Sequence, residues 1–302
     1  MKIYDCFTFY NELDMLEIRL NILDKYVDYF VLVEATKTHS GQEKKLYYKE
    51  NEVKFKKFKH KIIHIIVNDM PIIKDGDRWK LENFQRDSIM RGLTECQQDD
   101  IILVSDLDEI PNPKEIQRVE RLLMNNLKNS INRIFYSINR YFLKNITKNQ
   151  KIISYATKNI SDIESSSIVI FKQKLFYYYL NGFVNDSWLG TRAVSYQNLV
   201  RYFDASPQKI RIKMSNNILN NGGWHFSYLF DPFGISLKIK SFAHSEFDSG
   251  IYTDEDEIKK KIEDGSDLFG RQGKIKYINV DCSYPLFILE NIKKYSKLIK
   301  SV

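Results

Sequence analysis

The 302-residue chain has few cysteines and no long apolar run. Its three cysteines, Cys6, Cys96 and Cys282, have no metal-binding spacing, and their odd number leaves one unpaired in any disulfide scheme. They therefore predict reduced thiols rather than a disulfide framework. The apolar N-terminus is interrupted by Asp5, which excludes a signal-peptide core, and no run is long enough to span a bilayer. We expect a cytoplasmic protein without a signal peptide or transmembrane segment.

Two glycine-rich phosphate-binding patterns are also missing. Neither Gly-x-Gly-x-x-Gly nor the P-loop pattern occurs, so a nucleotide would need other phosphate contacts. The net charge of +7 suits an anionic ligand. The lysines, however, fall in short runs such as Lys56-Lys57, with no stripe of basic and aromatic residues typical of nucleic-acid binding. We therefore expect no nucleic-acid partner.

Short apolar runs and amphipathic segments alternate in the first half of the chain. We expect strands at residues 3–9, 29–33, 61–67 and 101–104, and helices from residue 11 or 12 to 23, over 50–58 and over 79–93. This alternation predicts an α/β fold with a Rossmann-type open sheet flanked by helices. From about residue 144 the strands become rich in Tyr and Phe, as at 168–179, which predicts an α+β half closed by a helix over 285–299.

Carboxylates directly follow the expected strand at 101–104. Asp106, Asp108 and Glu109 lie there, and Pro111 and Pro113 are expected to end the strand ladder. Open α/β sheets bind ligands beyond the carboxyl ends of their strands. Two Asp separated by one residue can place oxygens on one hard divalent cation, which in turn holds a diphosphate. The alternative is a solvated acidic turn after a core strand.

Two histidines are candidates for a third metal ligand. His225 lies in Gly-Gly-Trp-His, where small residues permit close backbone approach and Trp224 offers a stacking surface for a sugar. His244 lies two residues before Glu246. A hydrogen-bonded structural histidine is the alternative reading of each.

Other charged side chains are candidates for contacts with a nucleotide. Arg86 and Arg192 offer guanidinium groups that match phosphate in bidentate fashion, and a structural ion pair is the alternative for each. Glu34, at the end of the second expected strand, offers a carboxylate to a ribose or base; the alternative is that it caps the next turn.

Taken together, these features resemble glycosyltransferase family 17. The resemblance rests on residues 11–19 and 27–34, the loop to Gly41, Trp79 with Arg86, the acidic segment 99–111, Trp188 with Gly190-Thr191, and Gly223-Trp224-His225. It implies a GT-A fold, a UDP-GlcNAc donor, a glycan or glycoconjugate acceptor, Mn²⁺ or Mg²⁺, and inversion at the anomeric carbon. It also implies that Asp106 and Asp108 hold the metal. We expect no counterpart here of the N-terminal membrane anchor and luminal stem of the animal members.

We therefore expect one GT-A catalytic domain over residues 1–302, with a nucleotide-sugar half at 1–143 and an acceptor half at 144–302. The expected donor site comprises Glu34, Gly41, Trp79, Arg86, Asp106, Arg192 and Trp224, and the expected metal site Asp106, Asp108, His225 and His244. Glu246 is the expected catalytic base, with Asp186 and Asp231 as alternatives. The rival functions are a metal-dependent phosphohydrolase or nucleotidyltransferase and a non-catalytic glycan-binding protein.

Overall fold

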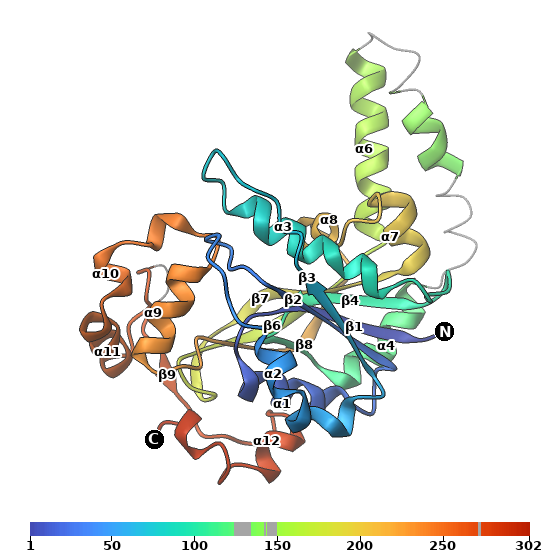
Figure 1. The fold of residues 1–302 in the computed structure, drawn as a ribbon. Coiled ribbons are helices and arrows are strands. Elements are labelled where there is room, and N and C mark those ends of the chain that lie inside the picture. The colour runs from blue at the N-terminus through green and yellow to red at the C-terminus, as the bar shows by residue number, and fades with distance from the viewer. Residues whose placement is uncertain (124–133, 142, 144–149, 271–272) are drawn as a thin grey trace.

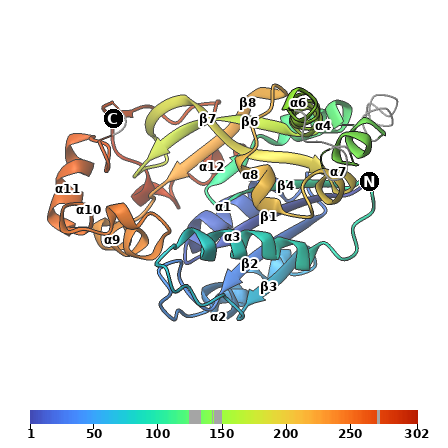
Figure 2. The ribbon, with the colours of Figure 1, turned by 90° about the horizontal axis from the view of Figure 1, so that it is seen from above.

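The described part of the chain forms one sheet with helices on both faces (Figures 1 and 2). A computed structural model describes residues 1–123, 134–141, 143, 150–270 and 273–302. Within them nine strands share one sheet in the order β3-β2-β1-β4-β7-β6-β8-β5, and β9 pairs with β7. The expected division at residues 143 and 144 adjoins residues 142 and 144–149, which lie outside the described residues.

The first half supplies four parallel strands. These are β1 (Ile3–Phe9), β2 (Tyr29–Ala35), β3 (Ile62–Val67) and β4 (Ile101–Asp106). All four were expected from their apolar runs. β4 extends two residues beyond the apolar run, so that Asp106 lies at the carboxyl end of the strand itself.

The second half completes the sheet with mixed pairing. Its strands are β6 (Val169–Tyr177), β7 (Gly182–Ser195), β8 (Ile218–Ser227) and β9 (Lys276–Tyr277), together with β5 (Glu109–Pro111), which follows the acidic turn. Antiparallel pairing of β4 with β7 joins the two halves, while β6 and β8 run parallel. The mixed sheet flanked by helices confirms the expected α/β fold class.

Alternating side chains of the strands feed two hydrophobic cores. On one face Phe7 and Leu103 pack with helices α1 (Leu13–Leu23), α4 (Pro113–Leu123) and α12 (Leu286–Glu290). On the other face Cys6 and Val104 pack with helices α3 (Trp79–Asp87), α6 (Gln150–Ser166), α7 (Tyr196–Tyr202) and α8 (Pro207–Ile212). This period-two alternation is that of a sheet covered on both sides.

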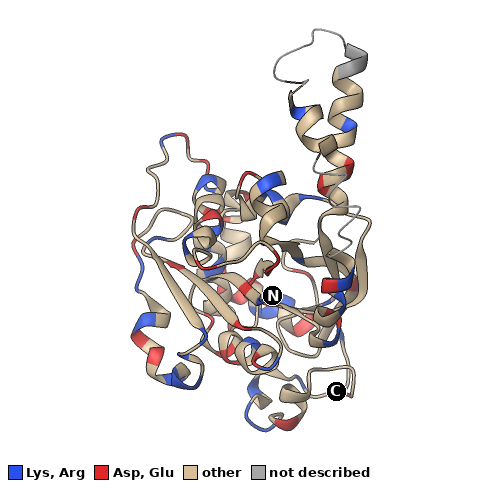
Figure 3. Ribbon diagram, turned by 90° about the vertical axis from the view of Figure 1, so that its right-hand side faces the viewer, with Lys and Arg blue, Asp and Glu red and all other residues tan. Residues whose placement is uncertain are grey.

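A third hydrophobic cluster lies at the end of the sheet formed by β6 and β8. It packs helices α9 (Pro232–Ser241) and α11 (Glu255–Asp264) against Leu175 and Tyr228, and the short helix α10 (Gly250–Thr253) contacts both helices. In Figure 1 this group lies on the side of the molecule opposite the N-terminus. Figure 3 views the molecule from the right-hand side of Figure 1, the side of the N-terminus, and shows basic and acidic residues interspersed over the visible elements.

Several sequence expectations need correction. Pro111 does not end the ladder, because it lies in β5, an edge strand where its missing N–H interrupts no central pairing. The helix expected at 79–93 divides into α3 and the 3₁₀ segment η2 (Ser88–Gly92). The helix expected at 285–299 ends at Glu290, because Asn291 leaves the helical region (φ −120°, ψ 23°), and only the 3₁₀ turn η4 (Ser296–Leu298) follows.

The remaining helical segments are short. The helix expected at 50–58 is α2 (Tyr47–Asn51) followed by the 3₁₀ segment η1 (Glu52–Phe58), and η3 (Ser245–Phe247) follows α9. In the part of the chain that the structure describes, none of the helices combines the length and the apolar character needed to cross a lipid bilayer.

Candidate functional site

A cavity of about 290 Å³ opens beyond the carboxyl ends of β1 and β4. Its walls come from both halves of the chain. The first half supplies the end of β1 and the residues after it, the loop at 37–44, α3 and the turn after β4, and the second half supplies residues of β6, β7 and β8 and the segment from α9 to η3. The volume is near the lower end of the range for small-molecule sites. The acidic turn at residues 106–109 forms one of its walls, at the edge where open α/β sheets bind ligands.

Arg19 holds the backbone of this turn from the core. Its guanidinium is fully buried and donates to both carboxylate oxygens of Asp5, at 2.8 and 2.6 Å. It also donates to the carbonyls of Asp106, Leu107 and Glu109 at 2.9–3.0 Å. A buried charge is tolerated only when it is paired and fully hydrogen-bonded, as here. The pair therefore fixes the path of the turn that carries the carboxylates.

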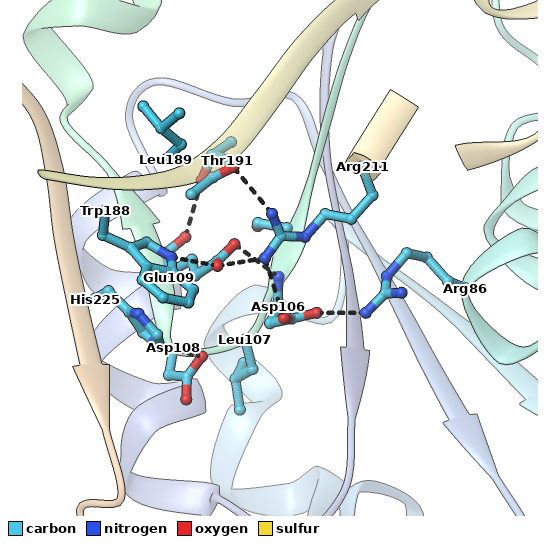
Figure 4. Close-up of polar contacts among 12 residues, drawn as sticks. Arg86, Asp106, Leu107, Asp108, Glu109, Trp188, Leu189, Thr191, Arg211 and His225 are labelled. Atoms are coloured by element: carbon cyan, nitrogen blue, oxygen red, sulfur yellow. Dashed lines mark hydrogen bonds and ion pairs between the residues drawn. The ribbon is translucent and has the colours of Figure 1, made fainter. Parts of the chain in front are cut away.

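Asp106 lies between two arginines (Figure 4). Arg86 of α3 is 2.9 Å from one of its carboxylate oxygens, and Arg211 of α8 is 3.3 Å from the other. Burial acts to raise the pKa of Asp106, but the two guanidinium groups outweigh it and hold the pKa well below its usual range. Both oxygens of Asp106 are thus engaged by cations of the chain itself.

Asp108 faces His225 of β8 and Lys238 of α9 (Figure 4 draws the histidine). His225 Nε2 lies 3.4 Å from one carboxylate oxygen, and Lys238 Nζ lies 3.3 Å from the other. Burial acts to raise the pKa of Asp108, but Lys238 and His225 lower it to about 2. Lys238 also lies 3.3 Å from Glu12, at the start of α1. Asp108 is therefore ionised and oriented toward the cavity.

Glu109 is fully buried beside the cavity. Its carboxylate accepts a hydrogen bond from Trp188 Nε1 at 2.7 Å and forms an ion pair with Arg211. Its carbonyl accepts from the Thr191 hydroxyl at 3.0 Å. The Trp188 ring in turn packs against His225, with centroids 4.6 Å apart. Glu109 thus fixes the tryptophan that positions the imidazole.

A divalent cation has two suitable protein ligands in this cavity. Among the described residues there is no group of three His, Cys, Asp or Glu side chains arranged to hold a metal ion. Asp108 and His225 nevertheless present an oxygen and a nitrogen, His225 Nε2, 3.4 Å apart. Carboxylate and imidazole are ordinary ligands of divalent transition metals. The pair fits a cation whose other ligands come from phosphate and water.

The structure brings six of the predicted site residues to the cavity: Trp79, Arg86, Asp106, Asp108, His225 and His244. The two histidines have different surroundings. His225 contacts Asp108, whereas His244 packs on the edge of Trp79 with centroids 4.6 Å apart and bonds Glu246 at 2.6 Å through Nδ1. The geometry thus favours His225 over His244 as the partner of Asp108.

Three predicted donor-site residues lie in the interior rather than in the cavity wall. Glu34 accepts a hydrogen bond from the backbone of Tyr48 at 3.0 Å and from His64 at 3.1 Å, which matches the capping alternative. Trp224 is packed in the core and donates to the Ser283 carbonyl at 3.1 Å. Arg192 donates to backbone carbonyls beside it, and burial, followed by the charge of Arg211, lowers its pKa to about 10.

The remaining predicted residues lie on exposed segments outside the cavity lining. Gly41 occupies a loop with φ +85°, a conformation that favours glycine. Asp186 is exposed on β7, and Asp231 caps α9 by accepting from Gly234 N at 2.7 Å. The Glu246 side chain is 56% exposed and meets the cavity through His244.

Several residues of the site have no motif in the sequence. Glu12 and Lys238 converge from the two halves, and Arg211 comes from a six-residue helix. Asp5 carries a usable signal, because it is the one charged residue in the largely apolar strand β1, whereas Arg19 shares its helix with Asp14 and Glu17. Such an interruption of a core segment indicates a buried pair. The partners of Lys238 and Arg211, by contrast, are set only by the tertiary fold.

Comparison with known proteins gives consistent matches. The sequence profile of glycosyltransferase family 17 matches residues 1–159. Three relatives named β-1,4-mannosyl-glycoprotein 4-β-N-acetylglucosaminyltransferase, from Rattus norvegicus, Homo sapiens and Mus musculus, are each 23% identical to the chain. The similarity covers 96% of the chain and 53% of each relative, so the chain spans about half the length of these proteins.

Proposed function

Because the chain belongs to glycosyltransferase family 17, we propose that it transfers GlcNAc from UDP-GlcNAc to a hydroxyl group of a glycan, with inversion at the anomeric carbon. The observation that carries this proposal is the convergence of Asp108, His225 and Lys238 on one cavity beyond β4. That edge of an open α/β sheet is where nucleotides bind. The family and the site thus point to the same class of reaction.

The donor diphosphate is proposed to bind beside Asp108. A Mn²⁺ or Mg²⁺ ion held by Asp108 and His225 would supply neutralisation of the charge that develops on the departing diphosphate. Arg86 and Lys238 offer further positive charge in the same cavity. Both are ion-paired, Arg86 with Asp106 and Glu82, and Lys238 with Asp108 and Glu12, so phosphate binding requires them to exchange partners. Arg86 is therefore proposed to bind phosphate only after it leaves Asp106 or Glu82.

The acceptor is proposed to be a glycan with a β-linked mannose. The support is the name of the three relatives, which describes transfer to a β-1,4-mannosyl glycoprotein. The base that takes the proton from the acceptor hydroxyl stays a prediction. Glu246 meets the cavity through its hydrogen bond to His244, whereas Asp186 and Asp231 lie outside the lining.

The proposal is tested in two stages with the purified full chain. Isothermal titration with UDP and UDP-GlcNAc, with and without Mn²⁺, should show metal-dependent binding. A turnover assay with a β-mannosyl glycopeptide, followed by NMR of the product, should show a β-linked GlcNAc. Release of phosphate or GlcNAc-phosphate without transfer would indicate the phosphohydrolase alternative. Binding without any turnover would indicate the glycan-binding alternative.

A further inference from the structure

A second cavity of about 260 Å³ adjoins the first one. The two share four lining residues, Glu12, Asp108, Tyr228 and Lys238. Lys238 Nζ lies 3.3 Å from a carboxylate oxygen of Asp108 and 3.3 Å from one of Glu12. These ion pairs form the partition between the cavities. Asp108, the proposed neighbour of the donor diphosphate, therefore borders both.

The second cavity has the chemistry of a carbohydrate site. Phe230 and Tyr228 give it aromatic surface, and Lys238 lies over both rings at 5.9 and 5.4 Å. Tyr228 adopts a left-handed backbone conformation (φ +57°), which is costly for a bulky residue and clusters at functional sites. Asn11 Oδ1 is buried and has no hydrogen-bond partner among the described residues. A buried acceptor left without a partner is costly, so a ligand hydroxyl there would be stabilising.

We propose that this second cavity binds the acceptor sugar, an inference that rests on the function proposed above. The ligand class is a neutral saccharide. Asn11, Glu12 and Asp108 present oxygen atoms, which accept hydrogen bonds from hydroxyl groups, and the carboxylates disfavour an anionic ligand. With Asp14, the lining holds three carboxylates against two cations, Lys54 and Lys238, so its charge balance is negative.

The position of the cavity agrees with the proposed chemistry. In the proposed complex, the donor in the first cavity has its diphosphate beside Asp108. The anomeric carbon bonded to that diphosphate then lies at the partition. A saccharide in the second cavity then meets the donor at its reacting end rather than at its base. Residues 11–15 line the second cavity and carry part of the resemblance to family 17. Acceptor binding is therefore the role proposed for this segment.

The test uses methyl β-D-mannopyranoside as a probe and the full chain saturated with UDP and Mn²⁺. Binding is followed by ligand-observed NMR titration in wild type, Phe230→Ala and Asn11→Ala. Phe233→Ala is the matched control, because Phe233 lies on α9, is 61% exposed and lines neither cavity. We expect the dissociation constant of the mannoside to rise about tenfold in Phe230→Ala. In Asn11→Ala it should rise about two- to tenfold, because one neutral hydrogen bond is lost. Phe233→Ala should bind as wild type.

The outcomes separate this inference from the proposed function. The assignment of the second cavity to the acceptor would be overturned if the wild type showed no saturable mannoside binding. It would also be overturned if Phe230→Ala and Asn11→Ala bound the mannoside as the wild type does. Failure of the wild type to bind UDP would overturn the proposed function. In that case, titration of the mannoside without nucleotide still measures whether the second cavity binds a saccharide. Circular dichroism checks folding, and Phe230→Leu replaces Phe230→Ala if the latter is unfolded.

Discussion

Arg19 and Asp5 form a fully buried, bidentate ion pair that also reaches the turn carrying Asp106 and Asp108. The aspartate comes from β1 and the arginine from α1, so two adjacent elements of the first half fix the geometry of a loop about 90 residues away. The carbonyls of this turn point at the guanidinium, which leaves the acidic side chains to face the cavity. The acidic turn is therefore held in place from the core by two residues that lie outside the cavity lining.

This relationship predicts a large and recoverable loss of stability. Arg19→Met leaves the Asp5 carboxylate buried without its partner, and breaking such a pair costs about 3–5 kcal/mol. The double variant with Asp5→Leu removes the stranded charge and should regain much of that loss. Urea unfolding of the three proteins measures both steps. A single variant within about 1 kcal/mol of wild type would contradict the pair's structural role.

The sequence was most informative where physical constraints are local. The strands β1, β2, β3 and β4 follow from runs of buried apolar residues, and the acidic turn follows because Asp106 and Asp108 come directly after one of them. The ion-pair partners of the charged side chains, in contrast, are set by tertiary packing. Whether Arg86 or Arg192 reaches Asp106 depends on how α3 and β7 pack on the sheet, and no local pattern encodes that.

The same reason explains the residues that lie away from the cavity. Trp224 sits beside His225 in sequence, but successive side chains of a strand point to opposite faces, so one enters the core and the other the cavity. Trp188 of β7, which packs on His225, lines the cavity instead, together with Trp79. Strand alternation was the available signal for this distinction.

The two histidines are predicted to differ in their effect on metal dependence. His225→Ala removes the imidazole beside Asp108 and should raise the Mn²⁺ concentration needed for half-maximal transfer by about tenfold or more. His244→Ala is the matched control, because its imidazole bonds Glu246 and packs on Trp79. Metal titrations of both variants make the comparison. A shifted requirement in His244→Ala alone would reverse the assignment.

Arg86 is predicted to contribute to donor binding. Arg86→Gln removes a charge-assisted contact to phosphate, typically worth about 1.5–3 kcal/mol, so kcat/KM for UDP-GlcNAc should fall about ten- to a hundredfold. Arg91→Gln serves as the control, because Arg91 lies in the adjoining segment and pairs with exposed Asp69. If both variants show wild-type kinetics while folded, the phosphates are held by other groups.

The depressed pKa of Asp108 predicts a specific dependence of stability on acid. Lys238 and His225 lower its pKa to about 2 in the folded protein, against 3.8 as the ordinary value. Between these values the unfolded chain binds more protons than the native one, so the free energy of unfolding rises with pH across this window. The contribution, about 2 kcal/mol at 1.36 kcal/mol for each pKa unit, is complete above about pH 4 and is lost as the pH falls toward 2.

Asp108→Asn lacks this titration, so its free energy of unfolding should fall less than that of wild type between about pH 5 and pH 2. Urea unfolding at several pH values measures how steeply the free energy of unfolding of each protein changes with pH. Asp69→Asn is the comparison, because Arg91 also lowers the pKa of Asp69 but both side chains are solvent-exposed, where screening weakens the coupling. Its slope should stay close to that of wild type. An Asp108→Asn protein with the wild-type acid dependence would show that Asp108 is not held by Lys238 and His225 in solution.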